Sequence, residues 1–235
     1  MTTIVGIKAE KGVEGIVLAS DLAGTREEWQ ARGDIAVRKQ SQSETQKIYV
    51  DEKQEAAISM TGVLDSAYQK FLVQMLKGDI NLKKALQNDE KIFPELLSLS
   101  LSRWGNMEAN DYRNSLLIAT RFNKKPQLYS CWPLGKVVPT DGIAIGSGSQ
   151  YAIEYIANLG KLIPYEVSIE DAIEMTSKAL ERASSQDLYT RGLDIVVVTA
   201  GGIHSYGDTI KEKVDAAMDS AIDGIKADIA AKKKR

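Results

Sequence analysis

The succession of strand-like and helical segments predicts an α+β fold for this chain of 235 residues. Strand patterns occur in groups separated by pairs of helical patterns, rather than alternating one by one with helices, which is typical of α+β proteins. Two strand groups and two helix pairs allow a stack of four layers, with helices outside two packed sheets. The length fits one large domain, so we expect a single domain over residues 1–235.

Composition excludes several classes of protein. Hydrophobic residues make up 43% of the chain and charged residues 26%, which is close to globular averages and argues against wholesale disorder. The 30 Lys and Arg against 32 Asp and Glu give no general reason to expect nucleic acid or an anionic membrane as a partner. The single cysteine excludes an internal disulfide framework, and the single histidine excludes a metal site built on several histidines.

We expect the protein to be located in the cytoplasm. No apolar run approaches the roughly 18–20 residues that a membrane span needs. The first residues reach a charge and a glycine too early for a secretory signal.

The N-terminal part predicts two pairs of strands. Residues 2–8 alternate and are rich in β-branched side chains, and residues 16–20 form a second apolar run. Residues 21–46 are polar and too long for an ordinary connection, so we expect a functional or interface loop there. Residues 47–50 and 56–60 predict the second strand pair.

Helical spacing follows, and then strands return. Apolar residues at three and four spacing predict helices around residues 67–76 and 82–103, the second bent or broken near Pro94. Strand patterns return at residues 115–121 and 127–132. Cys131 lies inside the second of these and is expected to be buried and unreactive.

The C-terminal part begins with a short strand at residues 142–145, which leads through Gly-Ser-Gly-Ser at 146–149 into a helix. Ser168 and Asp171 predict a capping box at the start of the next helix. Its expected apolar face consists of Ile169, Ala172, Ile173, Leu180 and Ala183. Residues 193–199 form the most apolar strand of the chain.

The last segment predicts a helix with a basic tail, over residues 209–235. The tail is most simply a favourable charge at a helix C-terminus, with docking to an acidic partner as the second interpretation. His204 sits among glycines and is interpreted as an exposed turn residue.

The start of the chain holds the first candidate for chemistry. Removal of Met1 would leave Thr2 as the first residue, directly before a strand. A free α-amine has a pKa of about 7.7–8.0 and can act as base for the hydroxyl of its own residue. Many proteins begin with Met-Thr, so this feature is weak evidence when it stands alone.

Two further candidates also have simple structural explanations. Asp21 ends one strand and Lys47 opens another, so the carboxylate can hold the ammonium, or the two form a surface pair worth about 0–1 kcal/mol. The Gly-Ser-Gly-Ser at 146–149 can bind a phosphate or form a tight turn with Ser149 as N-cap. The turn is favoured, because the segment lacks both a P-loop lysine and the spacing of a dinucleotide fingerprint.

These signals gain weight from their order along the chain. The order is Thr-Thr-Ile-Val-Gly at 2–6, Val-Leu-Ala-Ser-Asp at 17–21, Gln-Lys-Ile-Tyr at 46–49, Met-Thr-Gly at 60–62, Gly-Ser-Gly-Ser at 146–149 and Gly-Leu-Asp-Ile-Val-Val at 192–197. Over residues 2–200 the chain resembles proteasome β subunits of the N-terminal nucleophile hydrolase superfamily, and archaeal or bacterial proteasome-like proteins are the most similar in character.

The resemblance implies a fold and a set of catalytic roles. The fold is a four-layer αββα sandwich, in agreement with the order of elements. Thr2, once the initiator methionine is removed, corresponds to the nucleophile, with its α-amine as proton acceptor. Lys47 corresponds to the lysine that lowers the pKa of the nucleophile, and Asp21 to the carboxylate paired with it. Gly62 corresponds to the position whose backbone N–H stabilises the oxyanion.

Three other positions follow from the same resemblance. Ser147 corresponds to the serine near the threonine amine. Asp187 and Thr190 correspond to a carboxylate and a hydroxyl of the family and lie as far apart in the sequence as those two residues do. One extra residue precedes Gly192. Asp194 is more simply a structural residue at the edge of its strand.

The implied function is a threonine-type endopeptidase that hydrolyses unfolded proteins without metal or organic cofactor. The implied assembly is a ring of six or seven subunits, with an α-type ring and a regulatory ATPase as further partners. Three alternatives stay open: an inactive structural β-type subunit, an N-terminal-threonine amidase or peptide-transfer enzyme, and a plain binding module. Cleavage specificity does not carry over, because the loop before Lys47 is longer than is usual in the family.

Overall fold

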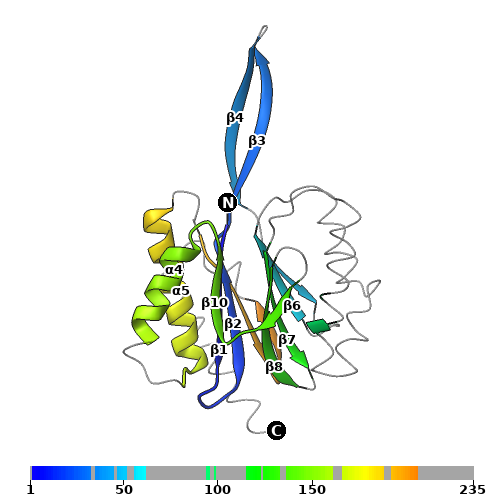
Figure 1. The fold of residues 1–235 in the computed structure, drawn as a ribbon, viewed down its shortest axis with the longest axis vertical. Coiled ribbons are helices and arrows are strands. Elements are labelled where there is room, and N and C mark those ends of the chain that lie inside the picture. The colour runs from blue at the N-terminus through cyan, green and yellow to red at the C-terminus, as the bar shows by residue number, and fades with distance from the viewer. Residues whose placement is uncertain are drawn as a thin grey trace.

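Two five-stranded sheets form the body of the protein, and helices cover the outer face of one of them (Figure 1). The computed structural model describes residues 2–32, 35–44, 47–51, 56–61, 94–95, 98, 115–122, 124–132, 136–160, 166–187 and 192–205. The architecture is an α+β sandwich, as the order of sequence patterns predicts. The helices expected around 67–76 and 82–103 lie outside these residues, except for Pro94, Glu95 and Ser98, which are helical.

The first sheet carries the N-terminus and has the order β10-β1-β2-β11-β12, with antiparallel neighbours throughout. Its strands were expected from apolar runs, except for the last, which is short. Their bounds are β1 Thr3–Ala9, β2 Gly15–Ser20, β10 Gly142–Gly146, β11 Asp194–Thr199 and β12 Gly202–Ser205. His204 therefore lies in a strand, opposite Val197 and half-buried, and its interpretation as an exposed turn residue is wrong.

The second sheet has the order β5-β6-β7-β8-β9 and is also antiparallel. Four of its strands match the predicted patterns, while β9 was not anticipated because three residues are too few to show a period. Their bounds are β5 Ile48–Asp51, β6 Ala56–Thr61, β7 Ser115–Phe122, β8 Lys125–Cys131 and β9 Val137–Pro139. Cys131 is buried as expected, and burial raises the pKa of its thiol.

Alternation along the central strands divides the core into two parts. Val5 and Val17 face the helices, whereas Ile4 and Leu18 face the second sheet and pack against its Leu117. Because successive side chains of a strand point to opposite faces, a strand buried on both faces is apolar throughout. The first sheet is therefore packed between a helical layer and the second sheet. The same two layers lie on either side of β1, which carries the N-terminus.

Two helices cover the outer face of the first sheet (Figure 1). They are α4, Ser149–Gly160, and α5, Ile169–Gln186. The capping box predicted for α5 is present, since Ser168 Oγ accepts from the Asp171 backbone N–H and the Asp171 carboxylate accepts from the Ser168 backbone N–H. The predicted apolar face of α5 is buried in full. None of the described helices is long and apolar enough to cross a membrane.

The segment before Lys47, expected to be a functional or interface loop, forms a ribbon of two strands. These are β3, Ala23–Arg32, and β4, Ile35–Glu44, and they pair with each other residue by residue. The ribbon projects away from both sheets and starts next to the N-terminal end of β1 (Figure 1). The prediction failed because it relied on apolar alternation, which develops only where one face of a strand is buried on a core.

Candidate active site

Thr2 lies directly before β1 and is buried, with 7% of its surface exposed. Its carbonyl oxygen accepts a hydrogen bond of 2.9 Å from the Ser147 backbone N–H. This contact depends on Gly146, which ends β10 with a φ of +103°. A Cβ at that position would lie 1.7 Å from the Thr2 carbonyl oxygen, so only glycine allows the turn to approach Thr2 this closely.

Asp21, directly after β2, joins the N-terminal strand to Lys47. One carboxylate oxygen accepts from the Thr3 backbone N–H at 2.7 Å, and the other accepts from Lys47 Nζ at 2.6 Å. The second oxygen also accepts from the Ala23 backbone N–H at 3.1 Å. The side chains of Asp21 and Lys47 are 0% and 2% exposed, so this is an ion pair within the core. The alternative of a surface pair is thereby excluded.

Burial works against both charges of this pair. Loss of hydration lowers the pKa of Lys47, and the negative charge and hydrogen bond of Asp21 oppose that shift. Burial likewise raises the pKa of Asp21, and Lys47 opposes that shift. Each charge therefore depends on the other, and together they place a shielded cation close to the start of β1.

A second pair lies on the other flank of the turn. Ser147 Oγ donates to Asp187 Oδ2 at 2.5 Å, in a solvent-exposed position. Asp187 is the C-cap of α5, and its backbone N–H donates to the Ala183 carbonyl at 2.7 Å. The negative charge of Asp187 also acts on Lys47. It raises the pKa of this lysine and so opposes the lowering that burial causes. The first pair thus bonds to the backbone of Thr3 and the second to that of Thr2, although the pairs come from distant parts of the chain.

A cleft of about 450 Å³ opens beside Thr2. Its lining includes the hydroxyl-bearing residues Thr61, Ser115 and Ser147 and the large apolar residues Trp132 and Ile153. The volume falls within the range of roughly 300–1,000 Å³ that small-molecule sites occupy. Among the residues that the structure describes, no group of three or more His, Cys, Asp or Glu side chains is placed to hold a metal ion.

Five of the seven residues singled out from the sequence converge here: Thr2, Asp21, Lys47, Ser147 and Asp187. The other two, Gly62 and Thr190, lie outside the described residues, as do the expected C-terminal helix and basic tail at 209–235. Thr61, the residue before Gly62, ends β6 and lines the cleft.

Two residues at the site were missed from the sequence. Thr3 donates its backbone N–H to Asp21 and accepts at its Oγ1 from the Gly148 N–H at 3.0 Å, so it links both flanks. Gly146 was noted only as part of a turn, although a glycine that ends a strand is a signal for a close backbone approach.

Asp194, expected to be structural, opens β11 and is buried opposite Ser20.

Comparison with known proteins agrees with this fold. A family model described as "Proteasome subunit" matches residues 1–199. The chain is 27% identical to proteasome subunit beta 2 of Pyrococcus furiosus over 215 residues, which cover 91% of this chain and 94% of that relative. It is 30% identical to proteasome subunit beta 2 of Thermococcus onnurineus, with coverage of 86% and 92%, and 29% identical to a proteasome subunit beta of Methanopyrus kandleri, with coverage of 92% and 95%. With its sandwich fold and the match over most of its length, this chain belongs to the proteasome subunit family.

Proposed function

We propose that the chain, as one peptidase domain over residues 1–235, is a threonine-type endopeptidase subunit that cleaves unfolded proteins. The nucleophile is Thr2, exposed as the N-terminal residue once Met1 is removed. The observation that carries the proposal is the position of Thr2 between the buried Asp21–Lys47 pair and the Ser147–Asp187 pair. An inactive subunit has no need for a buried ion pair whose charges are costly to keep out of water.

The reaction begins with attack of Thr2 Oγ on the carbonyl carbon of a peptide bond. The Thr2 α-amine accepts the hydroxyl proton, through a water molecule, and Lys47 stabilises the alkoxide by its charge. The backbone N–H of Gly62 donates to the oxyanion of the tetrahedral intermediate, an interaction whose loss costs about 100–1,000-fold in comparable sites. The C–N bond then breaks, and the α-amine returns the proton to the leaving amine.

An ester between the substrate's acyl group and Thr2 remains after the first step. A water molecule attacks it and gives a proton to the α-amine, the C–O bond to Thr2 breaks to release the acid, and the α-amine returns the proton to Thr2 Oγ. Asp187 and Thr190 keep the family's carboxylate and hydroxyl at their mutual spacing in the sequence, and we assign to Thr190, together with Ser147, the role of orienting the amine. None of these steps requires a metal ion or an organic cofactor.

The proposed setting is a closed ring of six or seven subunits in the cytoplasm, stacked with an α-type ring and fed by a regulatory ATPase. Membership of the proteasome family supports a ring. A peptidase active on any unfolded chain also needs enclosure, and cyclic symmetry supplies a closed chamber from one kind of interface.

Intact mass spectrometry of the assembled protein tests the nucleophile directly. The chain is weighed before and after treatment with a peptide epoxyketone, with Thr2→Ala as the control. We expect a mass without Met1, plus one adduct that the variant lacks. Retained Met1 with no adduct contradicts the proposal and favours the inactive structural subunit.

A second measurement separates the protease from the amidase and peptide-transfer alternatives. An unfolded, disulfide-free protein is incubated with the assembly, and the products are sequenced by mass spectrometry. A ladder of internal peptides supports the endopeptidase. Hydrolysis of small amides without such a ladder supports the amidase, and new peptide junctions support transfer.

A further inference from the structure

We propose that Thr3 is a positioning residue for the reaction, because its hydroxyl oxygen fixes the turn that carries Ser147 against Thr2. The inference rests on the proposed function, in which Ser147 helps to orient the α-amine of Thr2. Thr3 is 0% exposed. A buried hydroxyl group is costly unless it is hydrogen-bonded, so its bonding partner indicates the contact that it serves.

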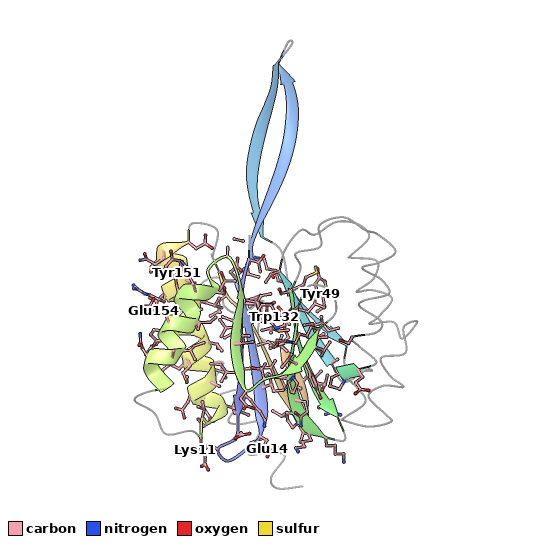
Figure 2. The ribbon with its side chains drawn as sticks, viewed as in Figure 1. Lys11, Glu14, Tyr49, Trp132, Tyr151 and Glu154 are labelled. Atoms are coloured by element: carbon pink, nitrogen blue, oxygen red, sulfur yellow. The ribbon has the colours of Figure 1, made fainter. Side chains whose placement is uncertain are left out.

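Alternation along β1 directs the Thr3 side chain toward the helical layer. Thr3 lies on the same face of the strand as Val5, which packs in the cluster that includes residues of α5. The part of that layer next to Thr3 is the start of α4, where the Gly148 carbonyl accepts from the backbone N–H groups of Tyr151 and Ala152 at 3.1 and 3.2 Å. Figure 2 shows Tyr151 on the upper part of α4, toward the end of the molecule where β1 begins.

The hydrogen bonds of Thr3 join two separate parts of the site. Its backbone N–H donates to Asp21 Oδ1 at 2.7 Å, and its carbonyl accepts from the Asp21 backbone N–H at 3.1 Å. Its Oγ1 accepts from the Gly148 backbone N–H at 3.0 Å. Thr3 therefore connects the residue that binds Lys47 to the turn that carries Ser147.

Two consecutive N–H groups of this turn bond to two consecutive residues at the start of the chain. Ser147 donates to the Thr2 carbonyl at 2.9 Å, and Gly148 donates to Thr3 Oγ1. The first bond is made by backbone alone, whereas the second depends on the Thr3 side chain. Together they fix both the distance and the orientation of the turn. Loss of the second would let the turn rotate about the first and would change where Ser147 Oγ lies.

A double-mutant cycle between Thr3→Val and Ser147→Ala tests this role, with kcat and KM of the assembled protein measured on one peptide that the wild type cleaves. Thr3→Val keeps the shape of the side chain and removes its acceptor. It should lower kcat by about 2–10-fold, the equivalent of one neutral hydrogen bond, with KM unchanged. Thr3→Ser, which keeps the hydroxyl, should restore kcat. In the Ser147→Ala background, Thr3→Val should cause no further loss, because it acts through Ser147.

The matched control is Thr199→Val, which removes the same kind of bond elsewhere in the first sheet. Thr199 Oγ1 accepts from the Gly201 backbone N–H at 3.2 Å, and Thr199 is 6% exposed. It pairs with Gly15, which pairs with Ala9 at the opposite end of β1 from Thr3. This control should leave kcat unchanged. If Thr3→Val does not assemble, Thr3→Cys takes its place in the cycle, since sulfur is only a weak acceptor.

Three outcomes overturn this inference while leaving the proposed function in place. The first is an equal loss of kcat from Thr3→Val with and without the Ser147 hydroxyl, which would show that the two residues act independently. The second is a Thr3→Ser variant as slow as Thr3→Val, and the third is an equal loss in Thr199→Val. A wild type with no adduct at Thr2 and no cleavage overturns the proposed function and the role of Thr3 together.

Discussion

The Asp21–Lys47 pair, next to Thr3, and the Ser147–Asp187 pair, next to Thr2, differ in their access to water. The first is 0% and 2% exposed and holds the Thr3 backbone N–H as well as the lysine. The second lies at the surface, at the end of α5. Water can replace a partner that is lost at the surface, and it cannot do so in the core. We therefore expect the buried pair to control both stability and activity, and the exposed pair to tune activity alone.

The largest effect should come from Lys47→Ala, which leaves the Asp21 carboxylate buried without its cation. Removal of one partner from a buried ion pair costs about 3–5 kcal/mol. We expect the free energy of unfolding in urea to fall by this amount and peptide cleavage to be lost. The double variant Asp21→Asn with Lys47→Met should recover most of the stability and none of the activity. A cost below about 1 kcal/mol for Lys47→Ala would show that the pair is solvated.

Gly146→Ala should sharpen the comparison, because Gly146 positions the turn that carries Ser147. The added Cβ would lie 1.7 Å from the Thr2 carbonyl oxygen, and φ is +103°, so the turn must move. A displacement of about 1 Å at a reacting group can reduce the rate about 100-fold. The control is Gly142→Ala on the same strand, where the nearest atom is 3.8 Å from the new Cβ. Equal epoxyketone labelling rates for the two variants would contradict the assigned role of Gly146.

The pH dependence should separate the buried lysine from the amine. Burial lowers the pKa of Lys47 below its ordinary 10.5. As pH rises through that lowered pKa, the ammonium loses its proton, so kcat/KM should fall before pH 10.5. On the acid side, the α-amine must be neutral to accept a proton, so kcat/KM should fall as pH drops through the pKa of that amine; an unperturbed α-amine has a pKa of about 7.7–8.0. An optimum well below pH 6 would contradict the free amine as base.

The same lysine has the opposite effect on stability. A lysine whose pKa is lower in the folded state binds its proton less tightly there than in the unfolded chain. Its contribution to the free energy of unfolding therefore rises with pH between the lowered pKa and 10.5. The difference in urea stability between the wild type and the double variant Asp21→Asn with Lys47→Met, measured across that window, checks the sign.

Asp187→Asn should have a smaller effect, because it weakens an exposed bond and leaves an oxygen that can still accept from Ser147. We expect kcat to fall by about tenfold or less, because one such hydrogen bond contributes about 0.5–1.5 kcal/mol. The melting temperature should be unchanged, since water can replace the partner of an exposed group. Steady-state kinetics and calorimetry provide the check. A loss of stability comparable to that of Lys47→Ala would erase the distinction between the two pairs.

The smallest effect should come from Glu174→Gln, which breaks the ion pair with Lys178 on the surface of α5. Both side chains are about half exposed, at 53% and 50%, so water replaces the lost partner. Activity and melting temperature should match the wild type. A measurable loss in either would mean that surface charges on α5 act on the site, in conflict with the contrast between buried and exposed pairs.

Much of the fold could be predicted from local patterns. Alternation of β-branched residues located β1, an apolar run located β2, and the spacing of Ser168 and Asp171 located the start of α5. These features depend on neighbours within one strand or one helical turn, so their signal is complete in a short stretch of sequence. The ribbon β3–β4 was not predicted. It projects away from both sheets, so no sheet face imposes an alternation of apolar and polar residues on it.

The candidate site shows the same contrast between features that the local sequence indicates and features that depend on tertiary packing. The order of motifs, through the family resemblance that it carries, identified Thr2, Asp21 and Lys47 as a set. The contacts that make them a site were decided by tertiary structure: the approach of Gly146 to Thr2, the bond between Ser147 and Asp187, and the cleft between Trp132 and Ile153. Such contacts join residues far apart in the chain, and they depend on strand register and layer packing, which no local period of the sequence specifies.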